Sequence, residues 1–246
     1  NKRRRTVSPM PFNRSIFTTR AITAFCFVVV MLTALLWSDT SFWLLIVVVH
    51  AGCWVEYQKI IQGFRQSLLY VSLGLIYITL SWVLFLDLHH FKFSNATTGI
   101  TAPAWSQWPL FVFVCMWIND TMAYLVGSFI GKTPFSPISP KKTWEGTLGG
   151  ILLTLLLGGI TADYLLGDLL MPGNLTPMAS YHWYIIALLA AIAGTLGDLL
   201  ESKFKRMAGI KDSGSILPGH GGFLDRFDSI LVTTPVIWLY IRLFLS

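Results

Sequence analysis

The residues best suited to chemistry in this 246-residue chain lie in one polar stretch, from Gly197 to Asp228. Its carboxylates can hold hard divalent cations through oxygen. Its glycines let backbone N–H groups approach an anionic ligand closely, and its lysines and arginines neutralise phosphates. Acidic and basic residues interleaved so densely predict a site for metal and polyphosphate. The carboxylates concerned are Asp198, Glu201, Asp212, Asp225 and Asp228.

Several other kinds of site are excluded for this stretch. No GxxxxGK[ST] loop occurs in the chain, so the phosphate site is not a Walker A loop. No Cys/His set has zinc spacing, and no serine stands in a GxSxG elbow. His220, inside the run Pro218-Gly219-His220-Gly221-Gly222, could act as a base or equally as a hydrogen-bond donor to phosphate.

A second polar cluster occupies residues 131–146. Three prolines stiffen it, and three lysines with two serines and two threonines supply cationic and hydroxyl donors. Such a set suits phosphate oxygens. An ordinary basic loop at the inner membrane face would explain the lysines, but it would not explain the proline and serine pattern. On this loop alone the two interpretations have equal weight.

A third cluster lies inside an apolar segment and contains Asp120 and Tyr124. Their separation of four residues places them on one face of a helix. A carboxylate at membrane depth is costly and indicates a functional site. The alternative is a structural hydrogen bond to a neighbouring helix.

These clusters must be positioned by membrane helices, because 54% of the chain is hydrophobic and only 12% is charged. That is about half the charge of an ordinary soluble domain. A bilayer core of ~30 Å needs ~20 helical residues, and apolar runs near that length recur along the chain. We predict an all-α polytopic transmembrane protein of about seven spans, at residues 21–37, 41–57, 68–88, 108–130, 148–166, 181–199 and 230–245.

The basic residues predict the orientation of these spans. With a cytoplasmic N-terminus, sixteen of the eighteen Lys and Arg residues fall on the cytoplasmic side, and only Lys92 and Arg242 fall outside. The positive-inside rule favours this arrangement. The net charge of +6 therefore indicates membrane topology and anionic ligands, and we expect no nucleic-acid partner. All three polar clusters then face the cytoplasm.

We divide the chain into three parts. Residues 1–20 form a basic cytoplasmic arm, which either rests on anionic lipid headgroups or only sets the topology. Residues 21–106 form an N-terminal transmembrane region, and residues 107–246 form a catalytic transmembrane region. The three cysteines all lie in apolar spans and are interpreted as small buried hydrophobes. Because Asp120 lies within the bilayer, the acceptor at the site is expected to be lipidic.

The stretch at residues 202–228 resembles the signature of the phosphatidate cytidylyltransferase, or CDP-diacylglycerol synthase, family. That signature is S-x-x-K-R-x4-K-D followed by P-G-H-G-G-x-x-D-R-x-D, and every fixed position is filled here. The segment from Asn119 to Tyr124 and the run from Ser139 to Gly146 are similar to the same family. The resemblance covers the chain from about Trp117 onward, and its form looks bacterial.

The resemblance implies that CTP and phosphatidic acid react to give CDP-diacylglycerol and pyrophosphate. It implies an enzyme in the bacterial inner membrane with its active site facing the cytoplasm and membrane lipids around it. Mg²⁺ would be held by Asp198 and Asp225, with Asp228 and Asp120 as further ligands or just behind them, and a second cation such as K⁺ is possible. We also expect a homodimer.

The residues expected to act in this reaction fall into two groups. Those assigned to catalysis are Asp198, Asp225, Asp228, Lys205, Lys211 and Asp120. Those assigned to substrate binding are Lys141, Lys142, Ser139, Ser202, Arg206, Gly219, His220, Gly221, Gly222, Arg226 and Tyr124. In the resemblance, the basic residues and the backbone at 219–222 bind phosphates, and the two serines add hydroxyl contacts.

The chain departs from the family in its N-terminal half. Family members often carry eight or nine spans, and two early helices are expected to be missing here. Two rival functions follow from the residues. One is a transporter or channel with Asp120 on its pathway, although the polar residues cluster at one membrane face. The other is a CTP-dependent enzyme that acts on a different lipid phosphate, such as an ether lipid or a polyprenol.

Overall fold

The computed structural model describes residues 14–91, 107–166, 180–214 and 221–245. Within these ranges all regular secondary structure is helical, apart from isolated β-bridge residues at Pro134, Thr143 and Gly221, of which the first two pair with each other. The all-α prediction is therefore confirmed. The helices are α1 (Arg14–Leu36), α2 (Asp39–Ile61), α3 (Ser67–Gly74), η1 (Leu75–Leu80), α4 (Ser81–His90), α5 (Gln107–Ile130), α6 (Trp144–Ile160), η2 (Thr161–Leu166), α8 (Tyr181–Met207) and α9 (Leu224–Phe244).

The described helices account for the predicted membrane spans. Five stretches are long and apolar enough to cross a bilayer: Asp39–Ile61, Leu68–His90, Trp108–Ile130, Tyr181–Met207 and Leu224–Phe244. Two shorter apolar helices, Ile22–Leu36 and Trp144–Ile160, bring the number to the seven expected. The second stretch runs through α3, the π-helical segment η1 and α4 as one span. The chain is thus a polytopic helical membrane protein; the cytoplasmic N-terminus stays a prediction.

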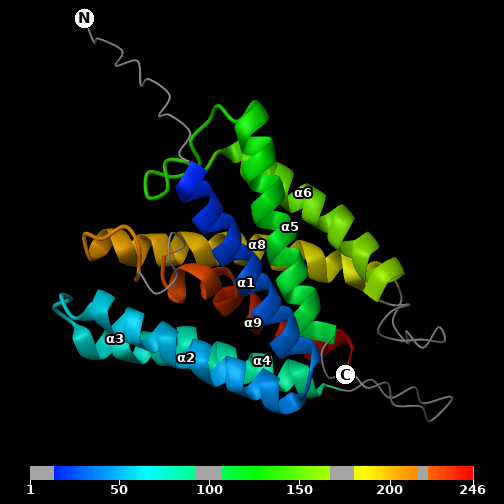
Figure 1. Cartoon of the computed structure of the whole chain (residues 1–246), viewed down its shortest axis with the longest axis horizontal. Helices are drawn as coiled ribbons and strands as arrows, with labels where there is room; N and C mark the ends of the chain where they lie inside the picture. Colours follow the sequence, from blue (N-terminus) through cyan, green and yellow to red (C-terminus); the bar gives the residue numbers. More distant parts are fainter. Residues whose placement is uncertain (1–13, 92–106, 167–179, 215–220, 246) are drawn as a thin grey trace, which may run out of the picture.

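Figure 1 shows the helices in two groups that meet at α9. Helix α5 packs along α6, α6 packs on α8, and α8 packs on α9. On the other side of α9, α4 contacts it directly, and α2 lies against α9 and α3. Helix α1 packs on α2 and crosses in front of the bundle. Helix α9 therefore has neighbours from both halves of the chain, which matters because its first two turns carry Asp225 and Asp228.

Small residues permit the close approach of α5 and α6. A Cβ atom on Gly146 would lie 2.7 Å from the carbonyl oxygen of Ala123 and 2.9 Å from the Cα of Gly127. A Cβ atom on Gly150 would lie 2.8 Å from the Cβ of Ala123. Such contacts leave no room for a larger side chain, as in other close-packed membrane helices. This packing brings the loop before α6 against α5, where Asp120 lies.

Helix α8 is longer than the predicted span. It continues from Tyr181 to Met207, eight residues beyond the expected end at residue 199. The residues added are good helix formers, and the helix stops just before Gly209, whose φ of 72° is left-handed. Hydropathy could not detect this extension because the added turns are polar. As a result, Asp198, Ser202 and Lys205 lie on one rigid helix.

Helix α9 begins six residues before the predicted start at residue 230. Asp225 and Asp228 were expected in the polar stretch before the span at residues 230–245, and the structure corrects this by placing both in the first turns of α9. Carboxylates are favourable at a helix N-terminus, where backbone N–H groups lack partners within the helix. The apolar run alone marks only the part of the helix that lies deeper in the membrane.

Candidate active site

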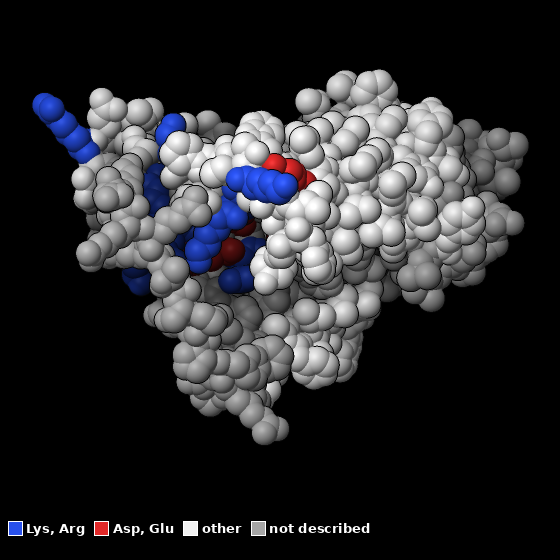
Figure 2. All heavy atoms as spheres, turned by 90° about the horizontal axis from the view of Figure 1, so that it is seen from above, with Lys and Arg blue, Asp and Glu red and all other residues white. Residues whose placement is uncertain are grey.

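The polar clusters of the sequence converge at one end of the molecule. Figure 2 shows Lys and Arg side chains around a hollow, with acidic side chains deeper inside it. The groups that meet there come from α5, from residues 131–143, from the last turns of α8 and from the first turns of α9. The convergence is direct: the guanidinium of Arg206 donates hydrogen bonds to the carbonyls of Ile138 and Ile210, and so joins two loops.

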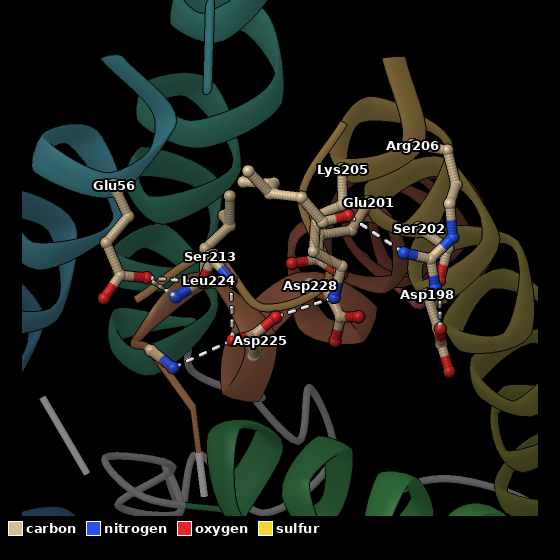
Figure 3. Close-up of polar contacts among 12 residues, drawn as sticks. Glu56, Asp198, Glu201, Ser202, Lys205, Arg206, Ser213, Leu224, Asp225 and Asp228 are labelled. Carbon is tan, nitrogen blue, oxygen red and sulfur yellow. Dashed lines mark hydrogen bonds and ion pairs between the residues drawn. The ribbon is translucent and has the colours of Figure 1, made fainter. Parts of the chain in front are cut away.

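The centre of the site is an ion-pair cluster between α8 and α9 (Figure 3). The ammonium of Lys205 lies 2.6 Å from Oδ1 of Asp225. It also pairs with Glu201, one turn earlier on α8. All three side chains are largely buried, with exposed fractions of 12%, 9% and 1% respectively. A buried cation between two carboxylates is compensated, and removal of one partner would leave an uncompensated charge.

Asp225 also organises the backbone around it. Its Oδ2 accepts hydrogen bonds from the backbone N–H of Ser213, at 3.0 Å, and of Gly222, at 2.8 Å. These two residues bracket the middle of the signature. Because one carboxylate binds both of them, it holds the segment's two ends together. Gly221, with a φ of 83°, adopts a left-handed conformation that suits glycine.

A second ion pair connects the lysine-rich loop to α8. The ammonium of Lys142 pairs with Oδ2 of Asp198, and the hydroxyl of Ser202 donates to Oδ1 of the same carboxylate at 3.2 Å. Both partners of the ion pair are about 30% exposed, so an incoming anion can reach them. The loop and the signature helix are thus joined at Asp198.

The lysine-rich loop is itself held in a fixed shape. The N–H of Phe135 donates to the carbonyl of Lys142 at 2.8 Å, and the N–H of Trp144 donates to the carbonyl of Thr133 at 2.9 Å. Glu145 closes the base of the loop. Its carboxylate accepts hydrogen bonds from the hydroxyl of Thr133 at 2.8 Å and from the backbone N–H groups of Lys132 and Thr133 at 3.2 Å. These contacts fix the start of the loop to the first turn of α6.

Two cavities flank Asp120, and its side chain lines both. The first, which we call the lysine cavity, has a volume of about 400 Å³ and is lined by Asn119, Asp120, Tyr124, Lys141, Lys142 and Asp198, among others. The second, the α1 cavity, has a volume of about 230 Å³. Its polar wall contains Asp120, Asp225, Arg226 and Asp228, and its apolar wall contains Phe27 and Val28 of α1. The first cavity thus combines two lysines with two aspartates, and the second joins charged side chains to an apolar surface.

The donor set at this site suits a hard cation. Among the described residues, no group of three or more acidic, His or Cys side chains is arranged to hold a metal ion as it stands. Asp120 and Asp198 line the lysine cavity, and Asp120, Asp225 and Asp228 line the α1 cavity. Within the described part of the chain, the buried Oδ1 of Asn119 has no hydrogen-bond partner. Such carboxylate and amide oxygens suit Mg²⁺, which prefers oxygen ligands.

Some predicted residues lie at the edge of the site or outside the described residues. Lys211 is exposed in the connection after α8, and Ser139 is partly exposed in the lysine-rich loop. Tyr124 lines the lysine cavity, as its spacing from Asp120 predicted, although 74% of it is exposed. Gly219 and His220 lie outside the described residues. The two predicted roles of His220, as a base or as a hydrogen-bond donor to phosphate, therefore stay predictions.

Two carboxylates of the site had no predicted role. Glu201 was noted in the polar stretch but not assigned, and the structure buries it against Lys205. Glu56, in α2, was missed entirely. It is 1% exposed and accepts hydrogen bonds from the signature segment. The signal that could have found it is the one that identified Asp120: an acidic residue within an apolar span.

Comparison with known proteins connects this geometry to a family. Residues 101–244 match the Cytidylyltransferase family. A phosphatidate cytidylyltransferase of Staphylococcus aureus (strain COL) is 34% identical over 201 residues, which cover 76% of this chain and 71% of the relative. That of Bacillus subtilis (strain 168) is 37% identical, covering 71% of this chain and 58% of the relative.

A third relative is more similar over a shorter region. The phosphatidate cytidylyltransferase of a Synechocystis species is 43% identical over 136 residues, or 55% of this chain and 43% of that protein. The chain therefore spans less than half of this relative's length and between half and three quarters of the other two. All three relatives are bacterial.

Proposed function

Because the chain belongs to the cytidylyltransferase family, we propose that it transfers the cytidylyl group of CTP to phosphatidic acid, forming CDP-diacylglycerol and pyrophosphate. The observation that carries the proposal is the position of Asp120, which lines both the lysine cavity and the α1 cavity. A pocket that carries two lysines, next to a pocket with an apolar wall, suits an enzyme that joins a nucleotide to a lipid phosphate.

The chemistry requires positioning more than proton transfer. An oxygen of the lipid phosphate attacks the α-phosphorus of CTP, a new P–O bond forms, and the bond to the leaving pyrophosphate breaks. The attacking oxygen is already anionic near neutral pH, so a strong general base is not required. The difficulty is to bring two anions together and to stabilise the leaving group, which fixed cations and backbone donors do well.

We assign the nucleotide to the lysine cavity. Lys141 and Lys142 lie on its wall, and Lys142 can exchange its contact with Asp198 for a phosphate oxygen. Ser139, Ser202, Arg206 and Lys211 lie on the surrounding loops and on α8, from where they can add contacts to the polyphosphate. The backbone at Gly221 is proposed to add an N–H donor, whereas the N–H of Gly222 is bound to Asp225. Gly219 and His220 are expected to belong to the same run.

We assign the lipid phosphate to the α1 cavity. Arg226 lies on its polar wall and can receive the headgroup. The apolar wall of the cavity continues along α1, because Phe27 also lines a further, almost wholly apolar cavity between α1 and α2. An acyl chain can therefore leave the reacting phosphate without crossing a polar surface, which is consistent with a substrate that stays in the membrane.

Mg²⁺ is proposed as the cofactor, held by Asp198 and Asp225 with Asp120 and Asp228 as further ligands or just behind them. Each carboxylate oxygen has two lone-pair positions, so Asp225 retains acceptor capacity at Oδ1 beside its contact with Lys205. The bound ion would neutralise phosphate charge. Lys205 holds Asp225 in place, and Ser202 orients Asp198 through its hydroxyl. A second cation such as K⁺ and a homodimer stay predictions.

We also propose that the site faces the cytoplasm of a bacterial inner membrane, with the N-terminus on the same side. Support comes from the distribution of Lys and Arg along the chain and from the bacterial relatives. The test uses a variant without the three native cysteines, with one new cysteine at Lys132 or at Trp37. An impermeant thiol reagent on intact cells should label the cysteine at position 37 only, and labelling at 132 alone would reverse the orientation.

The experiment that tests the activity is a pyrophosphate-release assay on the purified protein in lipid nanodiscs. Release is expected only when CTP, phosphatidic acid and Mg²⁺ are all present, and CDP-diacylglycerol should form in equal amount. Each component is omitted in turn as a control. The proposal fails if the complete mixture releases no pyrophosphate, or if release proceeds without a lipid acceptor.

The lipid acceptor is identified by a panel in the same assay. Phosphatidic acid, an ether-linked analogue and a polyprenyl phosphate are compared at equal mole fraction in the nanodisc. We expect phosphatidic acid to give the highest kcat/KM. A higher value for the polyprenyl phosphate would retain the cytidylyltransferase chemistry and replace the proposed acceptor.

A further inference from the structure

The carboxylate of Glu56 is buried against the signature segment, on the other side of Asp225 from Asp198 (Figure 3). Its Oε2 accepts a hydrogen bond from the hydroxyl of Ser213 at 2.6 Å and from the N–H of Leu224 at 2.9 Å. Its Oε1 accepts from the N–H of Phe223 at 3.0 Å. All three partners donate hydrogen bonds. An ionised carboxylate only accepts them, so it can satisfy all three.

Glu56 acts as the cap of a helix to which it does not belong. Phe223 is the N-cap residue of α9 and has no side-chain capping hydrogen bond, and Leu224 is the first residue of that helix. The first N–H groups of a helix need acceptors, and negative charge is favoured there. Glu56 supplies both from α2, in the part of the chain that precedes the family match at 101–244.

Two glycines of the signature, Gly214 and Gly222, pack closely against this carboxylate. A Cβ atom added to Gly214 or to Gly222 would collide with the carboxylate of Glu56. Both positions therefore require glycine because the carboxylate occupies the space where a side chain would be. Glu56 and the two glycines form one packed unit at the two ends of the segment.

The same segment is bound from its other side by Asp225. Ser213 gives its hydroxyl to Glu56 and its backbone N–H to Asp225. Gly222 packs on Glu56 and gives its N–H to Asp225. A change in the contacts of Glu56 is thus passed to Asp225 through two residues that touch both carboxylates.

We propose that Glu56 is a positioning residue, which fixes Ser213, Gly214 and residues 221–224 so that Asp225 and the turn at Gly221 are held in place for the nucleotide. It touches no substrate. Through it, helix α2 of the N-terminal half contacts the residues that hold Asp225. This inference rests on the proposed function, because the nucleotide that the segment receives is CTP.

The test is the variant Glu56→Gln, which keeps the size of the side chain but replaces one acceptor with an NH₂ donor. Phe223 and Leu224 donate to different oxygens, so either orientation of the amide sets a donor against a backbone N–H. The first readout is hydrogen–deuterium exchange. The amides of Ser213 and Gly222, which bind Asp225 and not Glu56, should exchange about tenfold faster. A merely local role would accelerate only the amides of Phe223 and Leu224.

The second readout is kinetic. The KM for CTP should rise about tenfold in Glu56→Gln, while the KM for phosphatidic acid stays near that of the parent protein. A protein that is only less well folded would lose active fraction without a change in KM. The matched control is Asp39→Asn, the same chemical change at the other end of α2, where the carboxylate is 62% exposed and contacts His89. It should alter neither readout.

Two results would overturn the inference: unchanged exchange at Ser213 and Gly222, or an unchanged KM for CTP. If Glu56→Gln does not fold, Ser213→Ala replaces it, since that change removes one of the three hydrogen bonds and leaves both N–H contacts. It should move both readouts in the same direction by a smaller factor, and no movement would equally reject the role. Failure of the proposed function is separate, because the parent protein would then release no pyrophosphate.

Discussion

Lys205 and Asp225 form a buried ion pair of 2.6 Å that joins the last turns of α8 to the first turn of α9. Asp225 lines the α1 cavity and makes three contacts: one to Lys205 and two to backbone N–H groups. Its charge therefore serves both the electrostatics of the site and the shape of the segment around it.

The first prediction concerns this pair. Asp225→Asn should reduce the rate of pyrophosphate release by about 100-fold or more, because the change removes a charged contact that cannot be supplied by a neighbour. Lys205 would keep Glu201 as its only carboxylate partner among the described residues. The measurement is kcat/KM for CTP in nanodiscs.

The control for this change is Asp87→Asn. Asp87 also pairs with a cation of α9, Arg242, at 2.5 Å, and accepts a hydrogen bond from Trp238 at 2.6 Å, but near the opposite end of that helix. It should leave kcat/KM near the parent value. Equal losses in Asp225→Asn and Asp87→Asn would show that the α9 ion pairs serve folding alone.

The second prediction separates the lysines of the loop. Lys142→Ala should raise the KM for CTP by about tenfold, since a charge-assisted contact to phosphate is lost and Asp198 loses its cationic partner. Lys132→Ala, in the same loop but with an exposed side chain outside the lysine cavity, should change the KM little. Equal effects of the two substitutions would indicate a general contribution of positive charge, and no specific phosphate contact.

The third prediction concerns the packing that brings the loop to Asp120. Gly146→Ala should lower the free energy of unfolding by about 1–3 kcal/mol, because the added methyl group would contact the backbone of α5. The melting temperature in detergent, with activity after refolding into nanodiscs, measures the effect.

Gly63→Ala is the matched control for Gly146→Ala. Nothing lies within 4 Å of a Cβ atom at position 63, so the melting temperature should not fall. An equal loss of stability in both variants would contradict contact with α5 as the cause, because the effect of Gly→Ala on the unfolded chain alone favours folding.

The sequence predicted the membrane helices well because hydropathy directly reports which residues must face lipid. It placed the C-terminal end of α8 and the start of α9 too close to the apolar core. The last turns of α8 and the first turns of α9 are polar, so their sequences resemble a loop. The site residues were found through charge and spacing, and most of them do converge. What spacing could not give was the pairing, such as that of Lys142 with Asp198, which depends on how the loop folds back on α8.

Glu56 shows a different limit of the sequence. Its importance arises from contacts with residues about 160 positions away, between 157 for Ser213 and 168 for Leu224. No local pattern encodes such a contact. The acidic residue in an apolar span was a visible signal, yet its partners could be named only once α2 was seen against α9.

The last prediction concerns the metal. Removal of divalent cations with EDTA should abolish pyrophosphate release, and Mg²⁺ should restore it. Asp198→Asn should raise the Mg²⁺ concentration needed for half-maximal rate by about tenfold or more, because one charged oxygen ligand is replaced by a neutral one. Asp39→Asn should require the same Mg²⁺ concentration as the parent. Activity that persists in EDTA would leave Lys142, Lys205 and Arg226 as the cations that stabilise the leaving pyrophosphate, and the acidic residues would then serve only to position them.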